Sequence, residues 1–350
     1  MSTSPSSETT SAPEAAQPVR FGIIGVGIIG RQHAKRLTGE NSPGTLVAVA
    51  DANVEAAREV AAEYGVEAAP TVTELLARQD VDAAIIAVPS GLHADVTIEA
   101  LEAGKHVYLE KPIEITVEAA DRIRAAEQAS GKLLTIASQR RFAAENQYLK
   151  QLVSEGKLGR ITSATVEVPL WRSQEYYDSG AWRGTWKLDG GGALMNQGVH
   201  LVDLTLWLLG DVEEIFAHTG LLAHERIEVE DTVTATARLR SGAQLTFQAT
   251  TAAFGTLPIR MNLMGDAGSI VTESERVVHF HSRDDLELPE FEPVDIMLTQ
   301  ITDFAEAIRT GGRPLVSSAE ARAAVAFIEA VYESGRTGEP VEPAALPTGD

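Results

Sequence analysis

The chain has 350 residues, 44% of them hydrophobic, no cysteine, and a formal net charge of −21 at pH 7. This length and apolar content allow a large core and predict two domains. The negative charge argues against nucleic-acid and anionic-membrane partners, which need clustered cations, and the lack of cysteine excludes disulfides and thiolate chemistry.

The first 18 residues are rich in Ser, Thr, Pro and Ala, without the basic start and apolar core of a signal peptide. We therefore expect a disordered tail over 1–18 and a cytoplasmic protein. Because no run of about 18 apolar residues is present, the sequence predicts no transmembrane helix.

A buried-type apolar strand over 19–25 runs directly into a G-x-G-x-x-G motif. In such a motif Gly25 permits the tight turn, Gly27 lets backbone amides approach a pyrophosphate, and Gly30 lets the following helix pack on the strand. We expect five residues of this turn to bind a dinucleotide: Gly25, Gly27, Ile28, Ile29 and Gly30.

The next apolar run, 46–51, ends in Asp51, about 20 residues after the third glycine, where a carboxylate meets an adenosine ribose 2′-hydroxyl. A carboxylate there would repel a 2′-phosphate, so we expect NAD rather than NADP. No arginine directly follows Asp51, although Arg58, one helical turn further on, would weaken this preference.

Apolar runs alternate with helical segments from residue 19 to about 138. The predicted strands are 19–25, 46–51, 83–88, 106–110 and 133–137, and the predicted helices are 31–37, 54–64, 95–103 and 117–130. This alternation is typical of a parallel sheet with helices on both faces. We therefore predict a Rossmann NAD-binding domain of the α/β class over 19–138.

The pattern changes after residue 139. Residues 161–168, 233–239 and 243–249 alternate with period two, as half-exposed antiparallel strands do, and 238–242 is a turn. Helices are expected at 297–309 and 319–334. We predict an α+β domain for substrate binding and oligomerisation over 139–340, with one uncovered sheet face as the oligomer surface.

Two segments at the ends of predicted strands carry candidate site residues. The segment after strand 83–88 contains Pro89 and His93, and Glu110 and Lys111 lie at the end of strand 106–110. Ligands of parallel sheets bind at the carboxyl ends of strands, so all four are expected at the cofactor crevice. A lysine before a proline is usually a surface residue, but this position favours a catalytic role for Lys111. For His93, capping the next helix or packing beside the cofactor is favoured over chemistry.

Three glycines, 190–192, precede a helical segment through Leu209 that carries Asn196, His200 and Asp203 near one face. The structural alternative is a helix cap followed by a satisfied core histidine. A histidine pKa near neutrality suits removal of a hydroxyl proton, and a lysine ammonium can stabilise the developing alkoxide. The two residues therefore suit oxidation of a secondary alcohol. No metal is expected, because no H-x-x-H or H-E-x-x-H motif is present.

The glycine motif, Asp51, Glu110-Lys111-Pro112 and the segment from Gly190 to Asp203 together resemble the Gfo/Idh/MocA (glucose–fructose oxidoreductase/inositol dehydrogenase) family over about 19–340. The resemblance implies a Rossmann domain and a C-terminal domain with an open, mostly antiparallel sheet that forms homodimers or homotetramers. It also implies oxidation or reduction of a hydroxyl carbon of a sugar, nucleotide sugar or cyclitol.

The family's catalytic lysine and histidine map to Lys111 and His200. Many polyol-oxidising members carry aspartate four residues before the histidine, where this chain has Asn196. Asparagine cannot take a proton but can hydrogen-bond a substrate hydroxyl or orient His200. We therefore expect His200 to be the base, assisted by Asn196.

The segment 182–187, followed by Asn196-Gln197-Gly198, resembles a subgroup that includes nucleotide-sugar 3-dehydrogenases. Arg183 and Lys187 are candidates to contact an anionic substrate group, the alternative being a solvated loop flanked by packed tryptophans. Four aromatic residues are candidates to stack on a sugar: Trp171, Tyr176, Tyr177 and Trp182. The predicted substrate contacts are Lys111, Trp182, Arg183, Asn196 and His200.

Two other functions remain open. One is an NAD-dependent glycosidase of the same superfamily, which cleaves a glycoside through transient oxidation. The other is a non-catalytic, dinucleotide-responsive regulator, against which the presence of both Lys111 and His200 argues.

Overall fold

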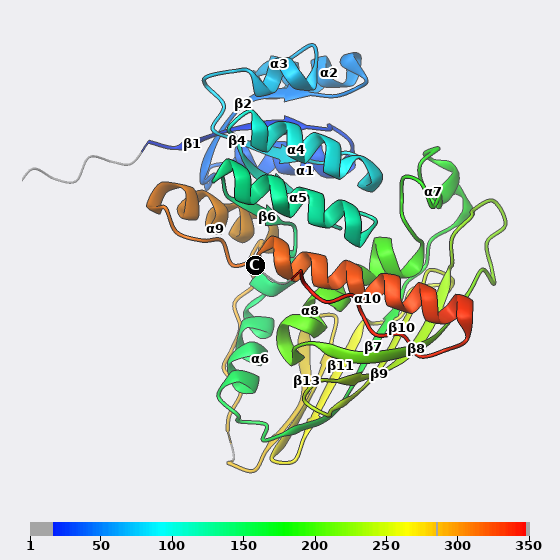
Figure 1. Cartoon of the computed structure of the whole chain (residues 1–350). Coiled ribbons are helices and arrows are strands. Elements are labelled where there is room, and N and C mark those ends of the chain that lie inside the picture. The colour runs from blue at the N-terminus through cyan, green and yellow to red at the C-terminus, as the bar shows by residue number, and fades with distance from the viewer. Residues whose placement is uncertain (1–16, 285, 348–350) are drawn as a thin grey trace, which may run out of the picture.

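Two β-sheets organise the chain, with helices on and between them (Figure 1). The structure, a computed structural model, describes residues 17–284 and 286–347. The predicted tail over 1–18 therefore lies outside the described residues, except for Gln17 and Pro18.

The N-terminal sheet has six parallel strands in the order β3-β2-β1-β4-β5-β6. Its strands are β1 (Val19–Ile24), β2 (Gly44–Ala50), β3 (Glu67–Ala68), β4 (Ala83–Ile86), β5 (His106–Leu109) and β6 (Leu134–Ile136). Its helices are α1 (Ile28–Leu37), α2 (Val54–Tyr64), α3 (Val72–Leu76), α4 (His93–Glu102) and α5 (Val117–Ser130). The predicted Rossmann fold is confirmed. The short β3 and α3 were not predicted, since elements this short show no clear periodicity.

Local sequence explains where these helices start and stop. The Asn53 side chain accepts from Ala56 N at the start of α2, and Gly131 ends α5 in the left-handed conformation. Helix α1 begins at Ile28, earlier than predicted, because Gly27 serves as its N-cap.

The C-terminal sheet has seven strands in the order β13-β12-β11-β7-β10-β9-β8, all antiparallel to their neighbours except the β7–β10 pair. They are β7 (Ile161–Pro169), β8 (Val212–Gly220), β9 (Thr232–Leu239), β10 (Gln244–Thr250), β11 (Arg260–Gly265), β12 (Gly268–Glu273) and β13 (Arg276–Ser282). The mostly antiparallel sheet is thus confirmed. Exposed side chains alternate with buried ones along β9 and β10, so one face is open. Its predicted role in oligomer formation stays a prediction.

Helices of the second half cover the other face and return to the first sheet. They are η2 (Gln139–Phe142), α6 (Ala144–Ser154), α7 (Gln174–Asp178), a π-helix η3 (Ala193–Gly198), α8 (Val199–Leu209), α9 (Ile296–Thr310) and α10 (Ser318–Thr337). Phe304 of α9 packs edge-on against Tyr108 of β5, with 6.1 Å between ring centroids. Helix α10 lies between α5 and the second sheet (Figure 1). The boundary between residues 138 and 139 stays a prediction, since α9 packs on the N-terminal sheet.

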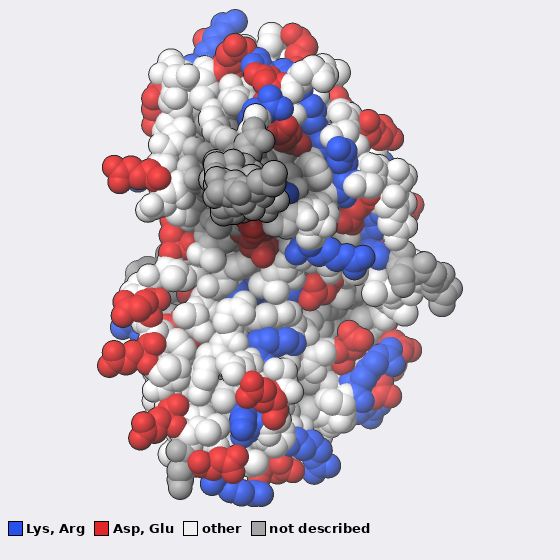
Figure 2. Space-filling view, turned by 90° about the vertical axis from the view of Figure 1, so that its left-hand side faces the viewer, with Lys and Arg blue, Asp and Glu red and all other residues white. Residues whose placement is uncertain are grey.

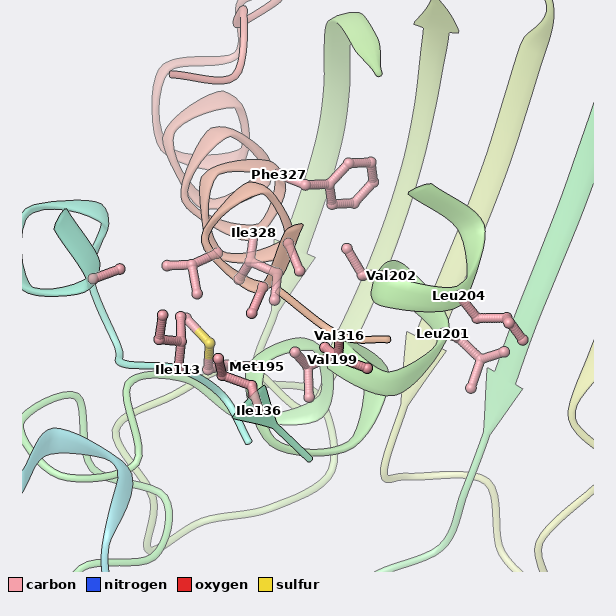
Figure 3. Packing of buried hydrophobic residues seen from close by; sticks show 14 of the residues in the cluster. Ile113, Ile136, Met195, Val199, Leu201, Val202, Leu204, Val316, Phe327 and Ile328 are labelled. Carbon is pink, nitrogen blue, oxygen red and sulfur yellow. The ribbon is translucent and has the colours of Figure 1, made fainter. Parts of the chain in front are cut away.

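Apolar packing joins the two halves below the strand ends. Figure 3 shows Ile113, from the loop after β5, and Ile136 of β6 beside Met195 of η3. Val199 of α8 lies in the same buried cluster as Ile328 of α10. This shared core fixes the loop after β5 against the start of α8.

Charged side chains of both signs are interspersed over the face shown in Figure 2. Among the helices of the described residues, none has the length and apolar character needed to cross a bilayer.

Candidate active site

The glycine turn after β1 has the close contacts that the motif predicts. Gly25 has φ +90°, and a Cβ there would collide with the backbone of Ala87 after β4. A Cβ on Gly30 would overlap the carbonyl oxygen of Gly25. A side chain at Gly25 would displace the loop after β4, and one at Gly30 would push α1 away from the glycine turn.

The first turn of α1 fits a dinucleotide pyrophosphate. Its N-cap, Gly27, provides no side-chain cap, and no acidic residue lies in the first turn. A Cβ on Gly27 would meet nothing within 4 Å, and Ile28 is 70% exposed. The amide groups of this turn are therefore open to an anion and lie at the positive end of the helix.

Asp51 lies at the carboxyl end of β2 and is tied to the glycine turn. One carboxylate oxygen accepts from Val26 N at 2.7 Å and the other from Asn53 N at 2.8 Å. Carboxylate oxygens have further lone pairs that ribose hydroxyls can use. Arg58 pairs with Glu55 at 2.5 Å, so its charge is directed to a carboxylate of its own helix.

The loop after β4 contacts the second half of the chain. Pro89 is the N-cap of a short 3₁₀-helix, η1 (Ser90–Leu92), in this loop, and Gly91 N donates to Leu188 O at 2.9 Å. His93, 1% exposed, lies with one ring nitrogen 2.7 Å from Pro112 O and the other 3.0 Å from Val88 O. This geometry fits the packing alternative for His93, which braces the loops after β4 and β5. Its predicted cofactor contact stays a prediction.

Lys111 enters the crevice from the end of β5. Its half-buried side chain donates from Nζ to Asn196 O at 2.7 Å. Burial lowers the pKa of the Lys111 ammonium, and the positive charge of Arg172 lowers it further. The negative charges of Glu110 and Asp189 oppose this shift. An ammonium has three donors, so the remaining ones are available to a substrate oxygen.

Glu110 is buried in the Rossmann domain, and one of its carboxylate oxygens accepts from Lys111 N at 3.2 Å. Its carboxylate accepts from Nε2 of the buried His33 on α1 at 2.8 Å. Burial raises the pKa of Glu110, but the hydrogen bond and charge of His33, with the charge of Lys111, outweigh burial and hold it below its usual value. An ionised Glu110 therefore connects helix α1, which follows the glycine turn, to the loop after β5 that carries Lys111.

His200 lies in the first turn of α8, directly after the π-helix η3. It lines, together with Lys111, Ser138 and Asp203, a small cavity of about 10 Å³, which is room for about one water molecule. Burial lowers the pKa of His200 well below its usual value, and the charges of Lys111 and Arg140 lower it further. The imidazole is therefore neutral at neutral pH and can accept a proton.

The π-helix η3 presents Asn196 to Lys111 and Asp189. Asn196 Nδ2 donates to the buried carboxylate of Asp189 at 2.5 Å, and its Oδ1 accepts from Gln197 Nε2 at 2.9 Å. Burial raises the pKa of Asp189, while hydrogen bonds from Gly184 N and Asn196 oppose this shift. The side chain of Asn196 is thus held in one orientation. A π turn is common at functional sites, and it was not predicted.

The aromatic segment before η3 packs around two arginines. The Arg183 guanidinium lies 4.4 Å from the ring centre of Tyr176 and 4.5 Å from that of Trp182. Tyr177 is buried and hydrogen-bonds Thr251 at 2.8 Å, so it belongs to the core rather than to a sugar-binding wall. The side chain of Lys187 is exposed.

Three residues near this site were missed by sequence reasoning: His33, Arg172 and Asp189. His33 follows the last glycine of the motif by three positions on the inward side of α1, and Asp189 directly precedes the glycine run. Their positions near these glycines could have identified both residues as candidate site residues. For Arg172, the only signal in the sequence was its position next to Trp171, a candidate sugar-stacking residue. The described residues contain no group of three or more His, Asp or Glu side chains that could hold a metal ion.

The buried carboxylate of Glu230 holds the start of η3. It accepts from Gly192 N and Leu194 N, each at 2.8 Å, and from Tyr332 Oη at 3.1 Å. Burial raises the pKa of Glu230 to about 7, although these hydrogen bonds oppose the shift.

A carboxyl whose pKa rises on folding stabilises the fold most when protonated. Relative to Glu230→Gln, the wild type should therefore lose unfolding free energy as the pH rises from about 5 to about 8, by up to about 3 kcal/mol. Urea unfolding of both proteins across this range measures the difference. Glu228→Gln, an exposed change in the same loop, should give a constant difference. Parallel curves for wild type and Glu230→Gln would contradict the prediction.

Comparison with known proteins gives two matching family models. A model of the GFO/IDH/MocA oxidoreductase family, with an NAD-binding Rossmann fold, matches residues 19–138. A model of the GFO/IDH/MocA C-terminal domain matches residues 146–271.

Individual relatives are similar over nearly the whole chain. Inositol 2-dehydrogenase of Rhizobium meliloti (strain 1021) is 28% identical over 336 residues, 90% of this chain and 96% of the relative. The scyllo-inositol 2-dehydrogenase (NAD(+)) of Bacillus subtilis (strain 168) is 27% identical over 339 residues, 93% and 96% of the two chains. The WlbA dehydrogenase from Bordetella pertussis, solved with NADH and UDP-GlcNAcA, is 33% identical, with a TM-score of 0.87 over 95% of this chain and 100% of that chain.

Proposed function

Because the chain belongs to the GFO/IDH/MocA oxidoreductase family and carries its NAD-binding Rossmann fold, we propose that it oxidises or reduces a secondary hydroxyl carbon of a sugar, nucleotide sugar or cyclitol. When bound, the nicotinamide supplies the hydride acceptor or donor. The relatives support this range of substrates, since two are inositol dehydrogenases and a third binds UDP-GlcNAcA.

The observation that carries the proposal is that Lys111 and His200, from opposite halves of the chain, lie close enough to line one small, water-sized cavity. The Lys111 ammonium donates to the substrate hydroxyl oxygen and stabilises its developing negative charge. The neutral His200 imidazole takes the hydroxyl proton during oxidation and returns it during reduction. Asn196 holds Lys111 through its carbonyl and offers its amide side chain to a neighbouring hydroxyl.

Cofactor reduction tests the proposal. Purified protein is mixed with NAD, and in parallel with NADP, and a panel of inositols, free sugars and UDP-sugars, and absorbance of the reduced cofactor is followed. We expect one substrate class to reduce NAD steadily and NADP much more slowly, because Asp51 repels a 2′-phosphate. Net hydrolysis of a glycoside without accumulation of NADH would instead favour the glycosidase alternative.

A further inference from the structure

Two arginines beside the proposed site have no acidic partner. Neither Arg172 nor Arg183 forms an ion pair with a carboxylate of the described residues; their hydrogen bonds go to Trp171 O, Gln197 Oε1 and Tyr176 Oη. In a chain with 50 acidic and 29 basic side chains, most arginines readily find a carboxylate. Two adjacent exceptions at one site therefore call for an explanation.

Both guanidiniums are fixed without being neutralised. Tyr176 lies between them, with its ring centre 4.4 Å from the Arg183 guanidinium and 5.2 Å from that of Arg172. Arg183 Nη1 donates to Tyr176 Oη at 2.7 Å, and Arg172 Nη2 donates to Gln197 Oε1 at 2.9 Å. The buried Arg172 Nε has no acceptor among the described residues. Each planar fork thus keeps donors that the protein does not use.

A short chain of contacts connects these arginines to Lys111. Gln197, which accepts from Arg172, donates to Asn196 Oδ1 at 2.9 Å. The carbonyl of Asn196 in turn accepts from Lys111 Nζ at 2.7 Å. The charges of Arg172 and Arg183 add to burial in lowering the pKa of Lys111. The three cations are therefore close enough to repel one another.

The charges of Glu110 and Asp189 offset part of the positive charge at Lys111, but neither carboxylate pairs directly with Arg172 or Arg183. Glu110 accepts from His33 inside the Rossmann core, and Asp189 accepts from Gly184 N and Asn196 Nδ2. A neutral polyol would leave the repulsion among the cations unchanged. An oxyanion would relieve it and would also match the fork geometry of a guanidinium.

We propose that the substrate carries an oxyanion, a carboxylate or a phosphate, which Arg172 and Arg183 bind while the reacting hydroxyl lies at Lys111. This inference rests on the proposed function. It excludes a neutral cyclitol as the preferred substrate, although inositol dehydrogenases are among the relatives.

Binding to the NADH-loaded protein tests the inference without requiring turnover. Isothermal titration calorimetry measures the affinity for four probes: glucose, glucuronate, UDP-glucose and UDP-glucuronate. The affinity for glucuronate is compared with that for glucose. The affinities for the two UDP-sugars are compared with each other and with that for glucose. We expect an acidic probe to bind about 10- to 100-fold more tightly than its neutral counterpart. If the oxyanion is a sugar carboxylate, glucuronate exceeds glucose. If it is the diphosphate, UDP-glucose exceeds glucose while the two UDP-sugars bind equally.

Variants connect the preference to the two arginines. Arg172→Met and Arg183→Met should each reduce the ratio of acidic to neutral affinity about 10-fold or more, whereas a merely disordered loop would weaken both probes equally. Arg183→Lys should recover part of the ratio, because it keeps the charge. The control is Arg226→Met, a nearby arginine already paired with Asp178 at 2.6 Å, which should leave the ratio unchanged.

The outcomes separate the two proposals. Equal affinity for acidic and neutral probes in the wild type, or a ratio that survives both methionine variants, would overturn the oxyanion inference even if a neutral sugar reduces NAD. Arginine-dependent binding of acids without reduction of NAD by any sugar would support the inference and overturn the proposed function.

Discussion

Lys111→Met should lower kcat/KM about 100- to 1,000-fold, because it removes the donor that stabilises the developing alkoxide while keeping most of the side-chain volume. Binding of NADH should weaken far less than turnover, since most residues expected to hold the dinucleotide lie on the glycine turn and at Asp51, although Lys111 is also expected at the cofactor crevice. Initial rates with the substrate found in the panel, together with NADH titration, measure both effects.

The pH profile gives a second readout of the same variant. The charge of Lys111 helps to lower the pKa of His200, so its removal should move the acidic limb of kcat/KM to higher pH. Lys35→Met, which changes an exposed lysine on α1, serves as the control and should keep wild-type rates. Wild-type kcat/KM in Lys111→Met would rule out its proposed role.

Arg141→Met should lower the unfolding free energy by about 3 to 5 kcal/mol, because it leaves a buried carboxylate without its cation. Arg141 is 1% exposed and donates to both carboxylate oxygens of Asp203, at 2.9 and 2.7 Å. A third hydrogen bond, 2.7 Å long, reaches Glu320 at the start of α10. The arginine therefore joins three segments distant in sequence.

Two variants control this prediction. Arg238→Met removes a surface arginine paired with Glu213 at 2.8 Å and should cost about 0 to 1 kcal/mol. The double variant Arg141→Met, Asp203→Asn should recover part of the loss, since no unpaired charge remains on α8. Urea unfolding of all four proteins measures these values. Equal losses for Arg141→Met and Arg238→Met would show that the buried pair adds nothing.

Much of the fold could be predicted because its signals are local. The glycine motif and Asp51 predict a dinucleotide-binding turn, since only glycine tolerates the contacts found at Gly25 and Gly30. Period-two alternation predicted β9 and β10, because each strand has one buried and one exposed face. The strand that ends just before Lys111 was located by a different local signal, a short apolar run that is buried on both faces.

The assembly of the site depends on contacts between segments far apart in sequence. Lys111 meets Asn196, and Arg141 meets Asp203, only after the second half of the chain has packed on the first. No local pattern predicts such pairs, because their energies depend on burial and distance rather than on neighbours in sequence. The same holds for the π turn at η3, whose first amides bind Glu230.

The sequence by itself therefore determined the Rossmann fold, the family resemblance and the choice of Lys111 and His200 as candidates. Only the tertiary structure decided that Tyr177 belongs to the core, that His93 braces two loops, and that Arg172 joins Arg183 beside Lys111. The physical reason is that backbone conformation follows from short-range sterics and hydrophobic periodicity, whereas the charge balance of a site is set by which side chains the folded chain brings together.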